Sequence, residues 1–132
     1  METLREIAQW LGDCPLLPPL QADRLEADAP CGALFSQGIQ CLWRKADVQG
    51  GWRGRFRLVC ELRIRTLSDD NAQVWEQSER WLAVQDWVLA HPARLLGDNP
   101  VCLLEKGRLL QENGDGTAVY TAVLTVEYTR NG

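Results

Sequence analysis

The chain has 132 residues, of which 45% are hydrophobic and 24% charged, and its formal net charge is −4. These values predict one folded domain over residues 1–132, with a two-layer core of sheet and helix, and they exclude a disordered chain. The acidic balance disfavours a general nucleic-acid binder but leaves a local basic face open. No apolar run approaches the roughly 20 residues that cross a bilayer, and the N-terminus lacks the pattern of a signal peptide. We therefore expect no membrane partner and synthesis in a cytoplasm.

The first predicted element is a short helix over residues 2–11, ended by Gly12. Its apolar positions follow helical spacing: Leu4, Ile7, Ala8 and Leu11. Three prolines between residues 15 and 19 then exclude a helix or a central strand, which leaves an extended connector. Residues 20–25 are expected to form a short edge strand.

The central predicted element is a long strand over residues 55–66, entered through a glycine-rich turn at 50–54. Apolar residues take alternate positions along it: Phe56, Leu58, Cys60, Leu62 and Ile64. The other face is charged and is interrupted only by Val59: Arg55, Arg57, Glu61, Arg63 and Arg65. Strict alternation predicts one buried and one polar face. We expect a hairpin with the run at 39–46, preceded by a separate short apolar segment at 33–35.

A long helix is predicted from residue 72 to about residue 90, with N-cap candidates and acidic residues at 68–71. Its expected apolar face is Val74, Trp75, Trp81, Leu82, Val88 and Leu89, with Ser78 and Gln85 completing the stripe and Trp87 at its margin. The tryptophans suggest either a ligand box or core packing. Aromatic residues at helical spacing more often pack on a sheet, so we interpret them as core.

A second hairpin closes the chain. After the helix ends at His91–Pro92, one further turn is expected at 93–96 and a loop at 97–100. Strands are predicted at 101–111 and 117–129, and in the second one the apolar positions alternate with Thr121, Thr125 and Glu127: Tyr120, Ala122, Leu124, Val126 and Tyr128. This order predicts an α+β two-layer sandwich, in which a mainly antiparallel sheet carries the long helix and the short N-terminal helix on one face.

The sequence contains no recognisable catalytic or metal-binding motif. Its cysteines include no Cys-x-x-Cys pair, and we expect free, mostly buried thiols: Cys14, Cys31, Cys41, Cys60 and Cys102. His91 is predicted to cap the helix C-terminus because it stands beside Pro92 there, and a metal site is disfavoured because no cysteine lies near it at ligand spacing. Asp69 and Asp70 are typical of a helix start rather than of a magnesium site. We therefore predict no catalytic residue, no metal and no cofactor.

One sheet face has no helical cover in this arrangement. Open sheet faces and edges are natural sites of association between subunits. Arginines on alternate positions repel one another unless anions lie opposite, which favours contact with a subunit or partner over a solvated surface. The candidate interface is Arg55, Arg57, Arg63, Arg65 and Trp52. An assembly protein fits these features better than an enzyme does.

Three segments carry a family resemblance: the turn at 47–52 that leads into the Phe56 strand, the long helix after Ser68, and the stretch at 113–120 that continues to Tyr128. Together they resemble the small minor capsid proteins of tailed bacteriophages and prophages, of the tail-terminator or tail-completion type. The resemblance implies a virion structural protein, made in the bacterial cytoplasm, that forms a ring at the head-tail junction. It implies a ring commonly of six subunits, with the tail-tube protein and the head-completion or connector protein as partners, and DNA passing through the lumen.

Two other functions stay open at this point. A nucleic-acid-binding module would use the arginine face with Trp43 and Trp52 as stacking platforms, although the net charge disfavours it. A small enzyme or ligand-binding domain would need a pocket between helix and sheet, and the missing motifs make it the least favoured. A closed oligomer would support the ring, whereas a monomer that binds single strands with a steep salt dependence would support the binding module.

Overall fold

A computed structural model describes residues 3–25, 30–67, 71–112 and 116–132, with the backbone alone at 71–75 and 112. The elements that it describes are, in chain order, α1 (Thr3–Leu11), β1 (Leu20–Ala22), β2 (Cys31–Ala46), β3 (Trp52–Leu67), α2 (Asn71–Ala90), the 3-10 helix η1 (Arg94–Leu96), β4 (Asp98–Glu112) and β5 (Thr117–Asn131). The predicted order of helices and strands is confirmed, including the extra turn after the long helix.

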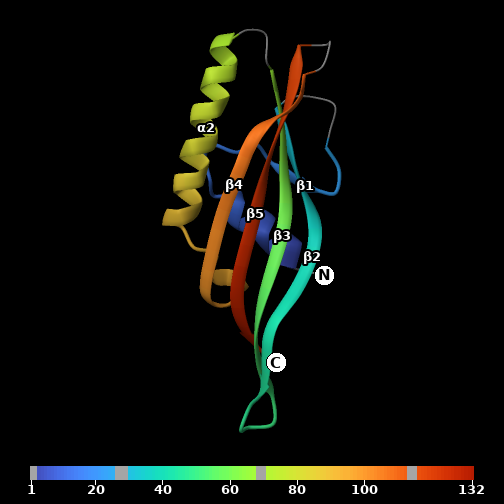
Figure 1. Cartoon of the computed structure of the whole chain (residues 1–132), viewed down its shortest axis with the longest axis vertical. Coiled ribbons are helices and arrows are strands. Elements are labelled where there is room, and N and C mark those ends of the chain that lie inside the picture. The colour runs from blue at the N-terminus through green and yellow to red at the C-terminus, as the bar shows by residue number, and fades with distance from the viewer. Residues whose placement is uncertain (1–2, 26–29, 68–70, 113–115) are drawn as a thin grey trace.

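The described strands form one twisted, five-stranded sheet in the order β1-β2-β3-β5-β4 (Figure 1). The short β1 pairs with β2 in parallel, and every other neighbouring pair is antiparallel. At the end of the molecule drawn lowest in Figure 1, the β2–β3 turn is closed by the Asp47 amide, which donates to the Gly51 carbonyl at 2.8 Å. Gly50 has φ +89° in this turn, a conformation that glycine adopts without strain. The C-terminal Gly132 pairs with Trp52 at the same end.

The core lies between the sheet and both helices. Alternate residues of β3 face it and are at most 5% exposed: Leu58, Cys60, Leu62 and Ile64. From β5 they meet Ala122, Leu124 and Val126, from α1 Ile7 and Leu11, and from α2 Val84 and Val88. The two helices contact each other through Trp10 and Trp87, whose ring centroids are 5.8 Å apart. Both helices therefore cover one face of a mainly antiparallel sheet, which confirms the predicted α+β two-layer sandwich.

The predicted apolar face of α2 is partly wrong. Leu82 and Leu89 are each 58% exposed, whereas Val84 and Val88 are at most 1% exposed and point into the core. Trp81 and Trp87 are half-buried at the margins of this stripe. Large indole rings are seldom fully buried, and the small valines allow the helix to approach the sheet closely. The predicted contributions of Val74 and Trp75 lie outside the described side chains.

Three strand boundaries also differ from the prediction. Residues 33–35 and 39–46 belong to a single strand, β2, because a register shift between Ser36 and Ile39 absorbs the residues expected to break it. The expected loop at 97–100 is mostly strand, since β4 begins at Asp98 and accommodates Pro100 on the outer edge of the sheet. The first edge strand stops earlier than predicted, at Ala22. The predicted N-cap residues at 68–70 and the turn at 113–115 lie outside the described residues.

Candidate assembly surface

The face of the sheet opposite the helices, called the open face below, carries the four predicted arginines of β3. In the strand register Arg57 lies opposite Glu127, Arg63 opposite Thr121, and Arg55 opposite Thr129, all on the neighbouring β5. The side chains of directly opposed residues share a face. The sequence left open whether this face carries the arginines of the central strand or the threonines of the last one. It carries both.

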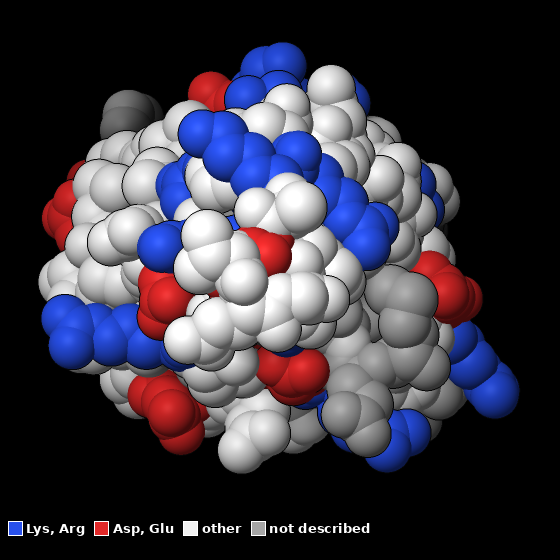
Figure 2. Space-filling view, turned by 90° about the horizontal axis from the view of Figure 1, so that it is seen from below, with Lys and Arg blue, Asp and Glu red and all other residues white. Residues whose placement is uncertain are grey.

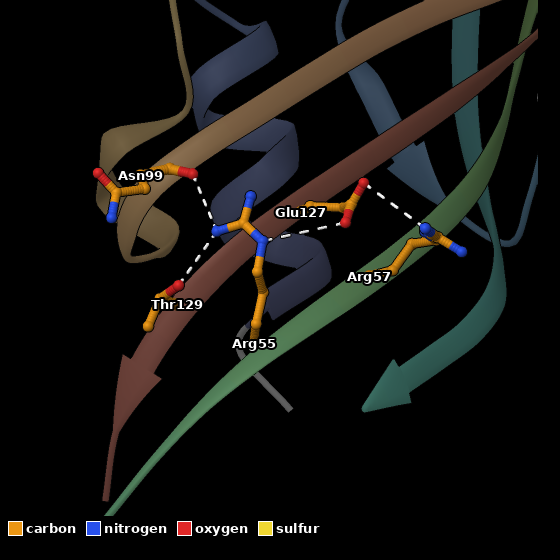
Figure 3. A network of polar contacts seen from close by, with 5 residues as sticks. All are labelled: Arg55, Arg57, Asn99, Glu127 and Thr129. Atoms are coloured by element: carbon orange, nitrogen blue, oxygen red, sulfur yellow. Dashed lines mark hydrogen bonds and ion pairs between the residues drawn. The ribbon is translucent and has the colours of Figure 1, made fainter. Parts of the chain in front are cut away.

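One polar cluster on the open face joins Arg55 and Arg57 through Glu127 (Figure 3). The Glu127 carboxylate lies 3.7 Å from Nη2 of Arg57 and 3.9 Å from Nε of Arg55. Nη1 of Arg55 also donates to the Asn99 carbonyl at 3.1 Å and to Oγ1 of Thr129 at 3.0 Å. A shared carboxylate reduces the repulsion between the two guanidinium groups. Because these side chains are partly exposed, each ion pair stabilises the fold by only about 0.2–1 kcal/mol.

A second cluster surrounds Glu61. Nε of Arg63 and the hydroxyl of Thr121 each donate to Oε1 of Glu61 at 2.8 Å. The hydrogen bond from Arg63 is the largest of the effects that together hold the pKa of Glu61 below its usual value. The guanidinium of Arg63 also stacks 4.9 Å from the ring centre of Phe35. The Arg65 guanidinium lies 3.5 Å from the Thr117 hydroxyl, near the far end of β3.

These contacts supply part of the acids that the sequence analysis expected opposite the arginines. Glu127 comes from the adjacent strand β5, whereas Glu61 comes from β3 itself. The exposed fraction is 40% for the Arg57 side chain and 36% for that of Arg63, so both still reach solvent. Contact between this face and another subunit or partner stays a prediction.

Trp52 does not lie on the same surface as the four arginines. It occupies an even position of β3, so its side chain is on the helix-covered face of the sheet. Its ring meets Phe56 edge-on at 5.8 Å, and the Arg44 guanidinium lies 4.3 Å from its centre. The five predicted interface residues therefore divide between two faces. For the same reason Trp43, which lies opposite Arg55, and Trp52 cannot form one stacking platform.

The two edges of the sheet expose apolar side chains that the sequence analysis did not single out. On the outer strand β4, Val101 is 55% and Leu103 is 40% exposed. On the other side, β1 pairs only with residues 32–34 of β2, and Ile39 beyond it is 41% exposed. The signal was present in the sequence as apolar residues on alternate positions of a predicted strand. Recognising it needed the strand order, which puts β4 and most of β2 at the edges.

A hollow of about 310 Å³ lies between α2 and β4. Its lining is largely apolar and includes Trp81, Leu104 and Leu109, and the Gln85 side chain donates to the Leu104 carbonyl at 2.8 Å. A register shift in β4 at residues 105–108 places Gly107 directly beneath the Trp81 ring. This is the pocket between helix and sheet that the ligand-binding alternative requires. Its described lining contains no cysteine, histidine or aspartate.

The cysteines are all free thiols, and their burial differs from the prediction at one position. Burial raises the pKa of Cys14 and Cys102, and raises that of Cys60 to about 11. Cys41, which was expected to be buried in its strand, is exposed. It lies opposite Phe56, on the face of the predicted apolar positions, but in the part of β2 that forms an unpaired edge of the described sheet beyond β1.

His91 follows the last turn of α2 and contacts it in two ways. Its Nδ1 lies 2.9 Å from the Trp87 carbonyl, and its ring stacks on the Trp87 ring at 4.6 Å. The predicted capping position is confirmed. In the part of the chain that the structure describes, no three His, Cys, Asp or Glu side chains are grouped to hold a metal ion. No helix within the described ranges is long and apolar enough to span a membrane.

No protein-family model matches this chain, and no curated protein matches it either. A proposal for its function therefore rests on the family resemblance in the sequence and on the geometry of the sheet.

Proposed function

We propose that this chain is a virion structural protein of the tail-terminator or tail-completion type, which forms a ring of identical subunits at the head-tail junction of a tailed phage or prophage. The observation that supports this proposal best is the pair of unlike sheet edges. One edge is β4 with Val101 and Leu103, and the other is the part of β2 beyond residue 34 with Ile39. Unpaired strands with exposed apolar side chains are surfaces on which sheets associate.

The directions of the two edge strands suit contact between neighbouring copies. Each step from β2 to β3, β5 and β4 reverses the strand direction, so β2 and β4 are antiparallel to each other. Two copies in the same orientation would therefore bring β4 of one copy against β2 of the next in an antiparallel pair. This contact joins two different surfaces, and contacts of that kind generate a ring when the rotation between copies closes.

The apolar side chains of the two edges also lie at similar heights along the sheet. Val101 and Leu103 stand level with Glu127 and Thr125 of β5, which pair with residues 57 and 59 of β3. Ile39 pairs with residue 58 of β3, within the same band. Neighbouring copies held side by side would thus align the two edges without a shift along the strands, with Val101 and Leu103 at the joint on the open face and Ile39 at the joint on the helix-covered face. Burial of apolar side chains then stabilises the contact.

In this arrangement the contacts between subunits use the two sheet edges, so the open face remains available to the proteins above and below the ring. We propose that Arg55, Arg57, Arg63 and Arg65 contact the tail-tube protein or the head connector, and that DNA passes through the lumen of a six-subunit ring. Arg57 and Arg63 are exposed enough to exchange their internal carboxylates for those of a partner. No enzymatic activity is part of this proposal.

The experiment compares two double variants of equal charge change. Val101→Lys with Leu103→Lys places cations on the β4 edge, whereas Leu82→Lys with Leu89→Lys places them on the exposed side of α2. Sedimentation should show a closed oligomer for the wild type and the α2 variant, and monomers for the β4 variant. Circular dichroism verifies the fold of each. A wild type that stays monomeric at every concentration, or equal assembly of both variants, would contradict the proposal.

A further inference from the structure

The hairpin end of the molecule carries a shallow hollow of about 700 Å³ beside the turn between β2 and β3. Its lining combines cations, one aromatic ring and amide groups, and includes Trp43, Lys45, Asp47, Arg53, Arg55 and Asn99. Figure 2 looks at the molecule from this end and shows a band of Lys and Arg side chains across it. The protein as a whole has a net charge of −4, so the sign of the charge is reversed locally.

Two of these cations face each other. Lys45 of β2 lies directly opposite Arg53 of β3 in the strand register, and both are exposed. Among the described residues neither forms an ion pair. Asp47 is the one carboxylate in the described lining, and its Oδ1 accepts the Gln49 amide at 3.3 Å within the turn. Like charges directly opposed on neighbouring strands destabilise a sheet, and an anion bound between them would remove that repulsion.

Trp43 extends the hollow toward Arg55. Its side chain lies opposite Arg55 in the register and is 38% exposed, and the ammonium of Lys45 is 5.5 Å from its ring centre. Proteins that bind single-stranded nucleic acid combine an exposed aromatic ring with a row of cations in this way. The phosphates pair with the cations, and a base stacks on the ring. An acidic peptide would pair with the cations but leave the ring without a role.

We propose that this hollow binds single-stranded nucleic acid, with phosphates at Lys45 and Arg53 and a base on Trp43. Its open shape suits a polymer that passes through, and its volume lies within the range of about 300–1,000 Å³ typical of ligand sites. The site does not depend on the ring. It is nearer the hairpin than the β4–β2 contact described above, and each copy of the chain has a complete one.

Binding of a fluorescent oligothymidylate, followed by anisotropy at low salt, tests the proposal. The wild-type chain should bind, and Lys45→Ala with Arg53→Ala should lower the affinity at least about tenfold. Lys106→Ala with Arg108→Ala is the matched control, because it removes two exposed cations from the opposite end of β4. This control should bind like the wild type. Each phosphate neutralised on a single strand contributes about −0.7 to the slope of log affinity against log salt, so two contacts predict a slope of about −1.4. The Lys45/Arg53 variant should lose most of that slope.

The role of the ring is tested separately. Trp43→Leu should weaken binding at least about fivefold, and Trp43→Phe should restore most of it, since phenylalanine still stacks on a base. Three results would overturn the proposal. The first is failure of the wild type to bind the oligonucleotide, and the second is an equal loss of affinity in both double variants. The third is efficient displacement of the oligonucleotide by polyglutamate together with unchanged binding by Trp43→Leu. Sedimentation of the same variants reports on assembly independently, so loss of the ring and loss of nucleic-acid binding remain distinguishable.

Discussion

Replacing Leu62 by alanine is expected to lower the free energy of unfolding by about 2–5 kcal/mol. Leu62 lies in the middle of β3 with 0% of its surface exposed, between Leu34 of β2 and Ala122 of β5. The substitution removes three buried carbon atoms, worth about 0.8 kcal/mol each on transfer, or roughly 2.4 kcal/mol. The cavity that remains adds to this loss, because close-packed neighbours collapse into it only in part.

Leu67 provides a control of the same residue type on the same strand. It ends β3 and is 57% exposed, so Leu67→Ala should change the free energy of unfolding by no more than about 0.5 kcal/mol. Urea denaturation followed by tryptophan fluorescence measures both variants, at one protein concentration so that assembly contributes equally. Similar midpoints for the two variants, or a Leu62→Ala loss below about 1 kcal/mol, would refute the side-chain orientation assigned to β3.

Two further predictions concern single groups. At pH 8 a mild alkylating reagent should label Cys41 rapidly and Cys60 only after denaturation, because Cys41 is exposed and burial raises the pKa of Cys60 to about 11. Peptide mass spectrometry reads the labelled positions. Rapid labelling of Cys60 in the native protein would show that its side chain had been assigned to the wrong face. The pKa of Glu61 is lowered in the fold, so its contribution to stability is present above the usual value of 4.5 and is lost as the pH falls below it. Glu61→Gln should therefore lose less stability than the wild type between pH 7 and pH 3, and parallel losses of the urea midpoint would argue against that ionic contact.

Regular alternation explains why β3 and β5 could be predicted from the sequence. A strand buried on one face needs apolar side chains at every second position, and Leu58, Leu62, Leu124 and Val126 satisfy this rule without interruption. The buried face of α2 was harder to predict from the sequence, because the most hydrophobic side chains of this helix are not its most buried ones. Leu82 and Leu89 are exposed, whereas Val84, which the predicted stripe omitted, is buried.

The candidate assembly surface depended on information that the sequence holds only indirectly. The arginines of the open face were placed correctly by alternation, but Trp52 was grouped with them despite its opposite phase. The edges could not be recognised before the strand order was known, since apolar residues on alternate positions, such as Val101 and Leu103, do not show whether their strand lies inside the sheet or at its edge. The edge had the same effect on Cys41, which lies opposite Phe56 on the helix-covered face but is exposed where β2 has no outer neighbour among the described strands.

The native mass of the purified wild-type chain tests the proposed ring most directly. Native mass spectrometry across a range of protein concentrations should show one closed oligomer, expected to be a hexamer of the 14.9 kDa chain, and electron microscopy of the same sample should show rings with a central channel. A chain that remains monomeric throughout, or that grows into open filaments of variable mass, would contradict the proposal.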